Sequence, residues 1–96
     1  MGTECLMAAP LIAVVDDDAM LRDLLHEVLS DEGYRTLLFG ETTAIVEALH
    51  QARPQLVLLD IRLEDRETGW RVLEDLRRDT VTAHLPVIVC SADRRC

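Results

Sequence analysis

The sequence has few aromatic residues and little positive charge. Aromatic side chains make up 3% of its 96 residues, no lysine is present, and the net charge is -8 at pH 7. Single-stranded nucleic acids are usually held by stacked aromatic rings, whereas duplexes and anionic membranes need a basic patch. We therefore expect no direct contact of this segment with nucleic acid or with a membrane.

Long apolar runs are also absent. No stretch approaches the roughly 18 residues of a membrane-spanning helix, and the N-terminus lacks the basic start of a secretion signal. The three cysteines have no metal-site spacing and are expected to be reduced thiols. These features predict a cytoplasmic protein, with residues 1–9 as a loose leader and residues 10–96 as one globular domain.

Four short segments predict β-strands. Leu11–Val15, Leu56–Leu59 and Val87–Cys90 are continuous apolar runs, which are typical of strands buried on both faces of a sheet. Arg35–Phe39 is a weaker strand, as is expected at a sheet edge.

Three segments between these strands have apolar residues at helical spacing, namely Leu21–Leu29, Thr42–Ala52 and Thr68–Arg78. Strands that alternate with helices predict an α/β fold with a parallel sheet covered on both faces. Because crossovers are right-handed, we expect a doubly wound, flavodoxin-like sheet with the strand order 2-1-3-4.

Acidic residues follow the two strands that this order places side by side. Asp16 and Asp17 end the first strand, and Asp60 ends the third. Ligands of such sheets bind beyond the carboxyl ends of the strands, where the winding reverses, and Mg²⁺ prefers oxygen ligands. The pattern predicts a magnesium site with the Ser91 hydroxyl at the same rim. Asp18 directly precedes the first helix and is expected to be its N-cap.

Three motifs carry a resemblance to a known family. Val14–Asp17, Leu56–Asp60 and Val87–Ala92 resemble, in type and order, the receiver domain of two-component response regulators. In that family an aspartate at the end of the third strand accepts a phosphoryl group from a histidine kinase or a phosphotransfer protein. The resemblance implies a signalling module and not an enzyme, one that assists its own phosphorylation and dephosphorylation and switches a partner interaction.

The resemblance also implies a role for each residue of the site. Asp60 would be the phosphoacceptor, and Ser91 would be the switch hydroxyl that moves toward the phosphoryl group. Magnesium would be held by Asp16, Asp17 and Asp60 together with the backbone carbonyl of Arg62.

Two departures from the family pattern stand out. The loop after the acceptor carries Glu64 in place of the family's proline, and Gly69 lies one position later than usual. The sequence also ends at Cys96, before the family's last helix, strand and helix and before its phosphate-contacting lysine. We therefore expect a receiver domain that is incomplete at its C-terminus. Its strand Val87–Cys90 would be an exposed edge, which predicts a homodimer through that edge.

Two other functions stay open. A phosphate-independent interaction module is favoured by the missing lysine and the missing output face. A phosphatase similar to haloacid dehalogenases would use Asp16–Asp18 as its nucleophile motif, but Met20 stands where that motif prefers Thr or Val, and its later lysine is absent.

Other conspicuous residues are expected to have ordinary structural roles. Trp70 shares the apolar side of its helix with Leu73 and should pack in the core. The remaining candidates should be solvated side chains: His26, His50, His84, Arg77 and Arg78.

Overall fold

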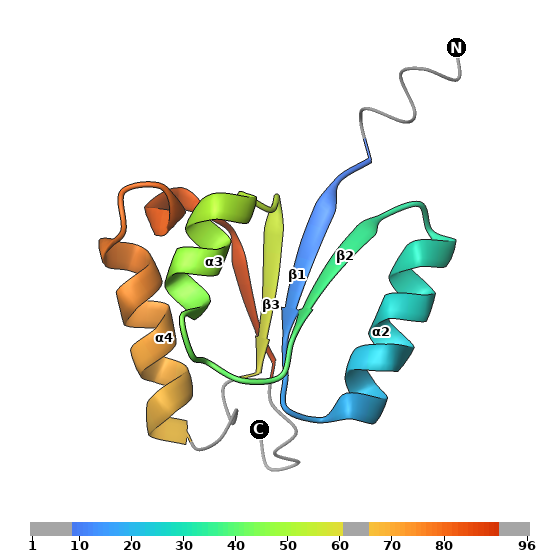
Figure 1. Ribbon diagram of the computed structural model, residues 1–96, viewed down its shortest axis with the longest axis horizontal. Helices are drawn as coiled ribbons and strands as arrows, with labels where there is room; N and C mark the ends of the chain where they lie inside the picture. Colours follow the sequence, from blue (N-terminus) through green and yellow to red (C-terminus); the bar gives the residue numbers. More distant parts are fainter. Residues whose placement is uncertain (1–8, 61–65, 91–96) are drawn as a thin grey trace.

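The computed structural model describes residues 9–60 and 66–90. Four strands and three α-helices alternate along the chain, and a short 3-10 helix precedes the last strand (Figure 1). Among these residues, no helix combines the length and the apolarity needed to cross a membrane. The elements are β1 (Leu11–Val15), α2 (Ala19–Asp31), β2 (Arg35–Phe39), α3 (Ile45–Ala52), β3 (Leu56–Asp60), α4 (Arg66–Arg78), η1 (Thr82–His84) and β4 (Val87–Cys90).

The strands form one parallel sheet in the order β2-β1-β3-β4, which confirms the predicted flavodoxin-like topology. Val15, the last residue of β1, aligns with Phe39 of β2 on one side and with Leu59 of β3 on the other. The winding reverses at β1, because the chain moves to one side of it for β2 and to the other side for β3. The carboxyl ends of β1 and β3 are therefore neighbours.

Most of the core lies between the sheet and the helices α3 and α4, which cover the same face (Figure 1). Burying one aliphatic side chain stabilises a fold by about 1.5–3 kcal/mol, so this layer is the main source of stability. Its buried members from the sheet and the two helices are Ala13, Val15, Ile45, Leu49, Val57, Leu59, Val72 and Leu76.

Among the described residues, α2 is the one helix that covers the opposite face (Figure 1). Asp18 is its N-cap, and the carboxylate accepts hydrogen bonds from the N–H groups of Met20 at 3.0 Å and Leu21 at 3.3 Å. No residue of α2 is buried, and Leu24 and Val28 are 54% and 49% exposed. The described part of the chain therefore covers the apolar side of α2 only in part.

The starts of two helices differ from the prediction. α3 begins at Ile45 and not at Thr42, because Ala44 has a left-handed φ of 56° that a right-handed helix excludes. α4 begins at Arg66, two residues before the predicted Thr68. The single turn η1 was not predicted.

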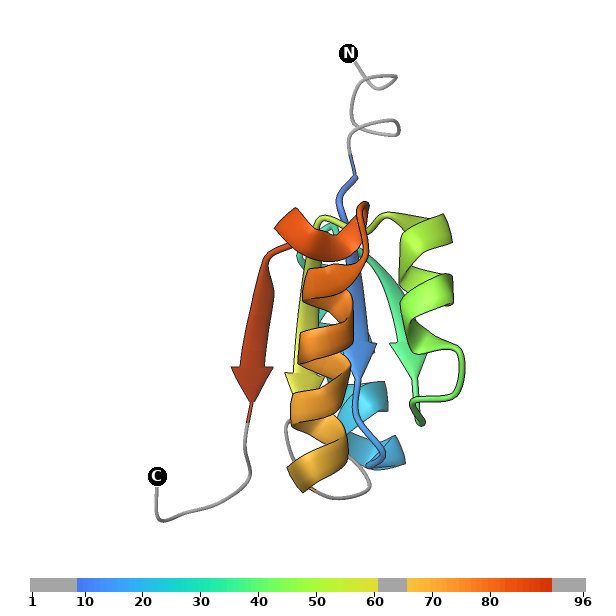
Figure 2. The ribbon, with the colours of Figure 1, turned by 90° about the vertical axis from the view of Figure 1, so that its left-hand side faces the viewer.

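In β4, Ile88 and Val89 are 51% and 41% exposed, because β4 pairs only with β3 among the described residues and is the outermost strand (Figure 2). The strand is therefore not buried on both faces, as its apolar run suggested, but lies at the edge of the described sheet, as its place in the strand order led us to expect. Trp70 is 51% exposed, and with Leu73 it lines a surface groove along α4 instead of filling the core.

A histidine and an aspartate connect α3 to the turn after α4. Asp79 Oδ2 accepts hydrogen bonds from the N–H groups of Val81 and Thr82, each at 3.0 Å, and His50 Nδ1 lies 2.9 Å from the same oxygen. The buried hydroxyl of Thr82 donates to the Leu76 carbonyl at 2.6 Å. The expectation that His50 is simply solvated is therefore wrong.

Two further side chains expected to be solvated also have partners. Arg77 Nη1 donates to the carbonyl oxygens of Ala83 at 3.0 Å and Leu85 at 2.8 Å. The His26 ring is hydrogen-bonded to the Thr36 hydroxyl. Arg77 thereby holds the η1 segment against α4.

Replacing Asp79 by Asn should lower the melting temperature at neutral pH. The hydrogen bond with His50 and those from the Thr82 and Val81 N–H groups favour the charged carboxylate and hold the pKa of Asp79 below its ordinary value. An acid of this kind contributes stability above its unfolded-state pKa and loses it as the pH falls through the folded-state pKa.

Thermal melting of wild type and Asp79→Asn over a range of pH tests this. The difference in melting temperature between wild type and Asp79→Asn should be present at pH 7 and shrink as the pH falls below about 4. Asp75→Asn, which removes an exposed carboxylate from α4, should melt like the wild type at pH 7. A difference between wild type and Asp79→Asn that does not change with pH would contradict this account.

Candidate functional site

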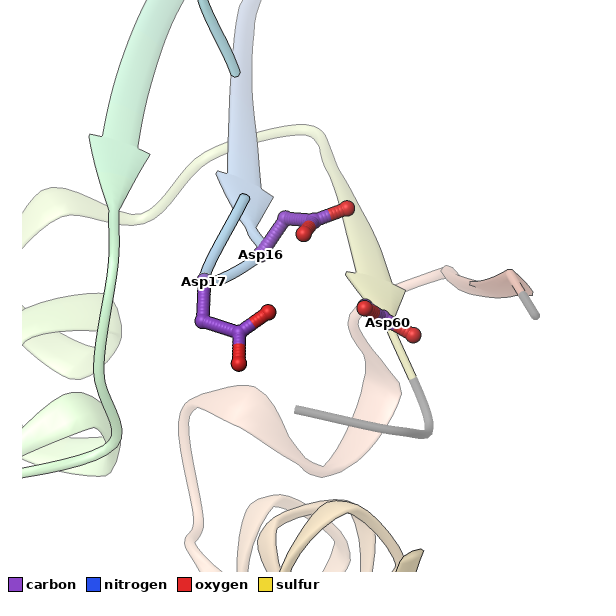
Figure 3. Close-up of side chains that lie close together, drawn as sticks. All are labelled: Asp16, Asp17 and Asp60. Atoms are coloured by element: carbon purple, nitrogen blue, oxygen red, sulfur yellow. The ribbon is translucent and has the colours of Figure 1, made fainter. Parts of the chain in front are cut away.

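Three carboxylates converge at the carboxyl edge of the sheet. Asp16 and Asp17 directly follow β1, and Asp60 is the last residue of β3 (Figure 3). One carboxylate oxygen from each lies within 4.8 Å of those of the other two. They meet because the reversal of the winding at β1 makes β1 and β3 neighbours.

Asp16 is held by three hydrogen bonds. Its backbone N–H donates to the Phe39 carbonyl of β2 at 2.9 Å, and its own carbonyl accepts from Arg22 Nη1 at 2.7 Å. Its carboxylate Oδ1 accepts from the Asp18 N–H at 2.9 Å. These bonds fix the turn from β1 into α2, so Asp17 enters the site from a fixed backbone.

The three carboxylates differ in their surroundings. Asp16 is 5% exposed, Asp60 is half-buried and Asp17 is exposed. Burial raises the pKa of Asp16; the hydrogen bond from the Asp18 N–H opposes this, and the charges of Asp60 and Asp17 raise the pKa further. Two unit charges 4 Å apart repel by about 4 kcal/mol near a protein surface. The three carboxylates therefore form a group able to hold a metal ion.

Cys90 lies beside the site as the register partner of Asp60. Burial raises the pKa of its thiol, and the charges of Asp60 and Asp16 raise it further. The thiol therefore stays neutral and adds no negative charge. The sequence prediction gave Cys90 no role, although the alignment of the two predicted strands places it here.

Two predicted site residues, Arg62 and Ser91, lie outside the described residues, so the metal-binding carbonyl and the switch hydroxyl stay predictions. Sequence reasoning also missed Arg22, which contacts Asp16, and Gly40, which lies against Arg22. The only sequence signal for Arg22 is its place four residues after the helix cap.

Comparison with known proteins identifies the class. The sequence pattern of the response regulator receiver domain matches residues 12–96, so the chain belongs to this family of two-component signalling modules. The DNA-binding response regulator MtrA of Mycobacterium tuberculosis is 40% identical over 81 residues, which cover 84% of this chain and 34% of MtrA. The chain therefore spans about a third of the length of this relative. The predicted resemblance is confirmed.

Solved structures share the fold. The N-terminal domain of a response regulator receiver protein from Methanoculleus marisnigri JR1 superposes with a TM-score of 0.79 at 37% identity, covering 88% of this chain and 68% of that one. The receiver domain of sensor histidine kinase PA1611 from Pseudomonas aeruginosa PAO1 superposes with a TM-score of 0.76 at 24% identity. The match covers 85% of this chain and 66% of that domain's chain. That domain has a magnesium ion coordinated in its active site cleft.

Asp16→Asn should raise the melting temperature when divalent cations are removed with EDTA. The substitution removes a charge that is both buried and repelled by two neighbouring carboxylates, while the amide oxygen can still accept from the Asp18 N–H. Thermal denaturation at pH 7 measures the effect. The control Asp75→Asn removes one exposed charge of α4 that is not part of the cluster and should change the melting temperature little. A lower melting temperature for Asp16→Asn would contradict this electrostatic description of the site.

Proposed function

We propose that residues 10–96 form a Mg²⁺-dependent phosphoacceptor module, with residues 1–9 as its leader. Asp60 accepts a phosphoryl group from a histidine kinase or a phosphotransfer protein, and this switches a partner interaction. The observation that carries the proposal is the placement of Asp60, whose oxygen lies within 4.8 Å of Asp16 and Asp17 oxygens where the sheet reverses its winding. A haloacid-dehalogenase-like phosphatase would instead use Asp16, directly after β1, as its nucleophile.

Asp60 is the nucleophile of the proposed reaction. One of its carboxylate oxygens attacks the phosphorus of a phosphohistidine; an O–P bond forms as the P–N bond breaks, and the released imidazole takes up a proton. Phosphoryl transfer depends mainly on positioning and on neutralising charge. β3 supplies the positioning, because Asp60 is its last residue and Leu59 beside it is fully buried.

The donor set fits a hard divalent cation. Asp16, Asp17 and Asp60 offer only carboxylate oxygens, which Mg²⁺ prefers, and their mutual repulsion is relieved by positive charge. When bound, Mg²⁺ neutralises part of the roughly -1.5 to -2 charges that the phosphoryl group brings. We include the Arg62 carbonyl as a further ligand and the Ser91 hydroxyl as the group that moves toward the phosphoryl oxygens.

The proposed partners follow from this chemistry. We place the module in the cytoplasm with its phosphodonor, and we propose no direct contact with DNA. The matched residues cover only 34% of MtrA, a relative named as DNA-binding, and the net charge of -8 of this chain disfavours a phosphate backbone. A phosphate-independent interaction module is the alternative. Uptake of a phosphoryl group distinguishes the two functions, because only the phosphoacceptor module would take one up.

Incubation with acetyl phosphate and Mg²⁺ should add one phosphoryl group to the wild type. Intact-mass spectrometry should show the adduct in the wild type and in the surface control Asp23→Asn, but neither in Asp60→Asn nor in the presence of EDTA. Equal labelling of Asp60→Asn would refute the acceptor assignment, and equal labelling with EDTA would refute the metal dependence.

We also propose that two copies of this chain pair through β4. Among the described residues β4 has a partner on one side only, it contains no charged residue, and Ile88 and Val89 expose apolar surface on its two faces. Such an edge can recruit a second strand. A twofold axis perpendicular to the sheet would place the two β4 strands antiparallel, so that each satisfies the free backbone groups of the other.

Val89→Lys should convert this dimer to a monomer, because a charge on each β4 would face its symmetry mate. Val28→Lys is the matched control, since Val28 is also about half exposed but lies on α2, away from β4. Sedimentation velocity at micromolar concentrations should show dimers for the wild type and Val28→Lys only. A monomeric wild type would contradict the pairing.

A further inference from the structure

Arg22 extends from α2 to the start of the site. Its backbone N–H donates to the Asp18 carbonyl at 3.0 Å, within the first turn of the helix, and its Nη1 donates to the Asp16 carbonyl at 2.7 Å. The side chain is half-buried, and α2 contains no other arginine or lysine. One guanidinium thus joins the first turn of α2 to the carboxyl end of β1.

Gly40, directly after β2, leaves the space that this guanidinium occupies. A Cβ placed on Gly40 would lie 2.7 Å from Arg22 Nη1 and 3.0 Å from Arg22 Cζ. Both distances are shorter than van der Waals contact, so a side chain at position 40 would displace the guanidinium. The φ of Gly40 is not positive, so space and not backbone conformation calls for glycine here.

We propose that Arg22 is a positioning residue for the cation site and that Gly40 provides the space that holds it in place. The Asp16 carbonyl belongs to the same planar peptide unit as the Asp17 N–H. By holding that carbonyl, Arg22 fixes the peptide plane from which Asp17 leaves the backbone, and so directs the Asp17 carboxylate toward Asp60. This inference rests on the proposed function, because it concerns the binding of the same cation.

A role in positioning and a role through charge alone predict opposite results. If Arg22 acted only as a positive charge near a cation site, its removal would tighten Mg²⁺ binding. If Arg22 positions Asp17, its removal weakens binding. Groups that orient metal ligands commonly change metal affinity by about 10–100-fold. Because Arg22 acts through the backbone, we expect the lower end of that range.

Titration calorimetry of the full chain with Mg²⁺ tests the proposal. Arg22→Gln and Gly40→Ala should each raise the Kd about tenfold, and the double variant should be no weaker than either single variant, since both remove one interaction. Arg22→Lys keeps the charge and one donor and should fall between the wild type and Arg22→Gln.

Gly33→Ala is the control for general destabilisation. Gly33 has a φ of 94° and no atom near its Cβ position, so alanine is strained there without contacting the site. This variant should melt at a lower temperature in EDTA but bind Mg²⁺ with the wild-type Kd. Melting curves in EDTA verify that the Arg22 and Gly40 variants are folded.

Two kinds of result would overturn the proposal. Tighter Mg²⁺ binding by Arg22→Gln would show that charge alone matters, and wild-type affinity of Gly40→Ala would show that the displaced guanidinium has no role. In either case, Mg²⁺ binding by the wild type would leave the proposed function intact. A wild type that binds no Mg²⁺ would overturn both the positioning role and the proposed function.

Discussion

Asp16, Asp17 and Asp60 repel one another, and the rest of the structure has to hold them together against this repulsion. Their charges are held within 4.8 Å of one another at the end of two adjacent strands, and one of them is buried. Packing behind the strands helps to offset this repulsion. The layer between the sheet and the helices α3 and α4 provides that packing, because the strand residues just before the acids, Val15 and Leu59, are almost fully buried in it.

The two sides of the site are built differently. On the β1 side, hydrogen bonds with β2, α2 and the cap region hold Asp16, and Gly40 leaves room for the guanidinium that makes one of them. On the β3 side, Asp60 aligns with Cys90 of β4, an edge strand whose side chains are largely exposed. The proposed metal binding and acceptor chemistry therefore draw on a firmly held Asp16 on one side and on an acceptor beside a lightly packed strand on the other.

The strands and their order follow from the sequence because each rests on a local pattern: a short apolar run, a helical repeat and the right-handed crossover rule. The convergence of Asp16, Asp17 and Asp60 follows from that order.

The start of α3 could not be predicted from the sequence, since it depends on the left-handed Ala44, a residue type that carries no signal for such a conformation. The contacts of three side chains could not be predicted either, because tertiary packing determines their partners. These contacts are His50 with Asp79, Arg77 with Leu85 and Arg22 with Asp16. Trp70 fits the helical repeat, yet it lies where the described chain places nothing over α4.

The most direct test of the central claim is the location of a bound cation. Crystals grown with Mn²⁺ as a substitute for Mg²⁺ would give an anomalous scattering signal at the metal. The account predicts one strong peak within coordination distance of carboxylate oxygens of Asp17 and Asp60, with Asp16 beside it. A structure in which these oxygens contact no metal while the protein is saturated with Mn²⁺ would contradict it.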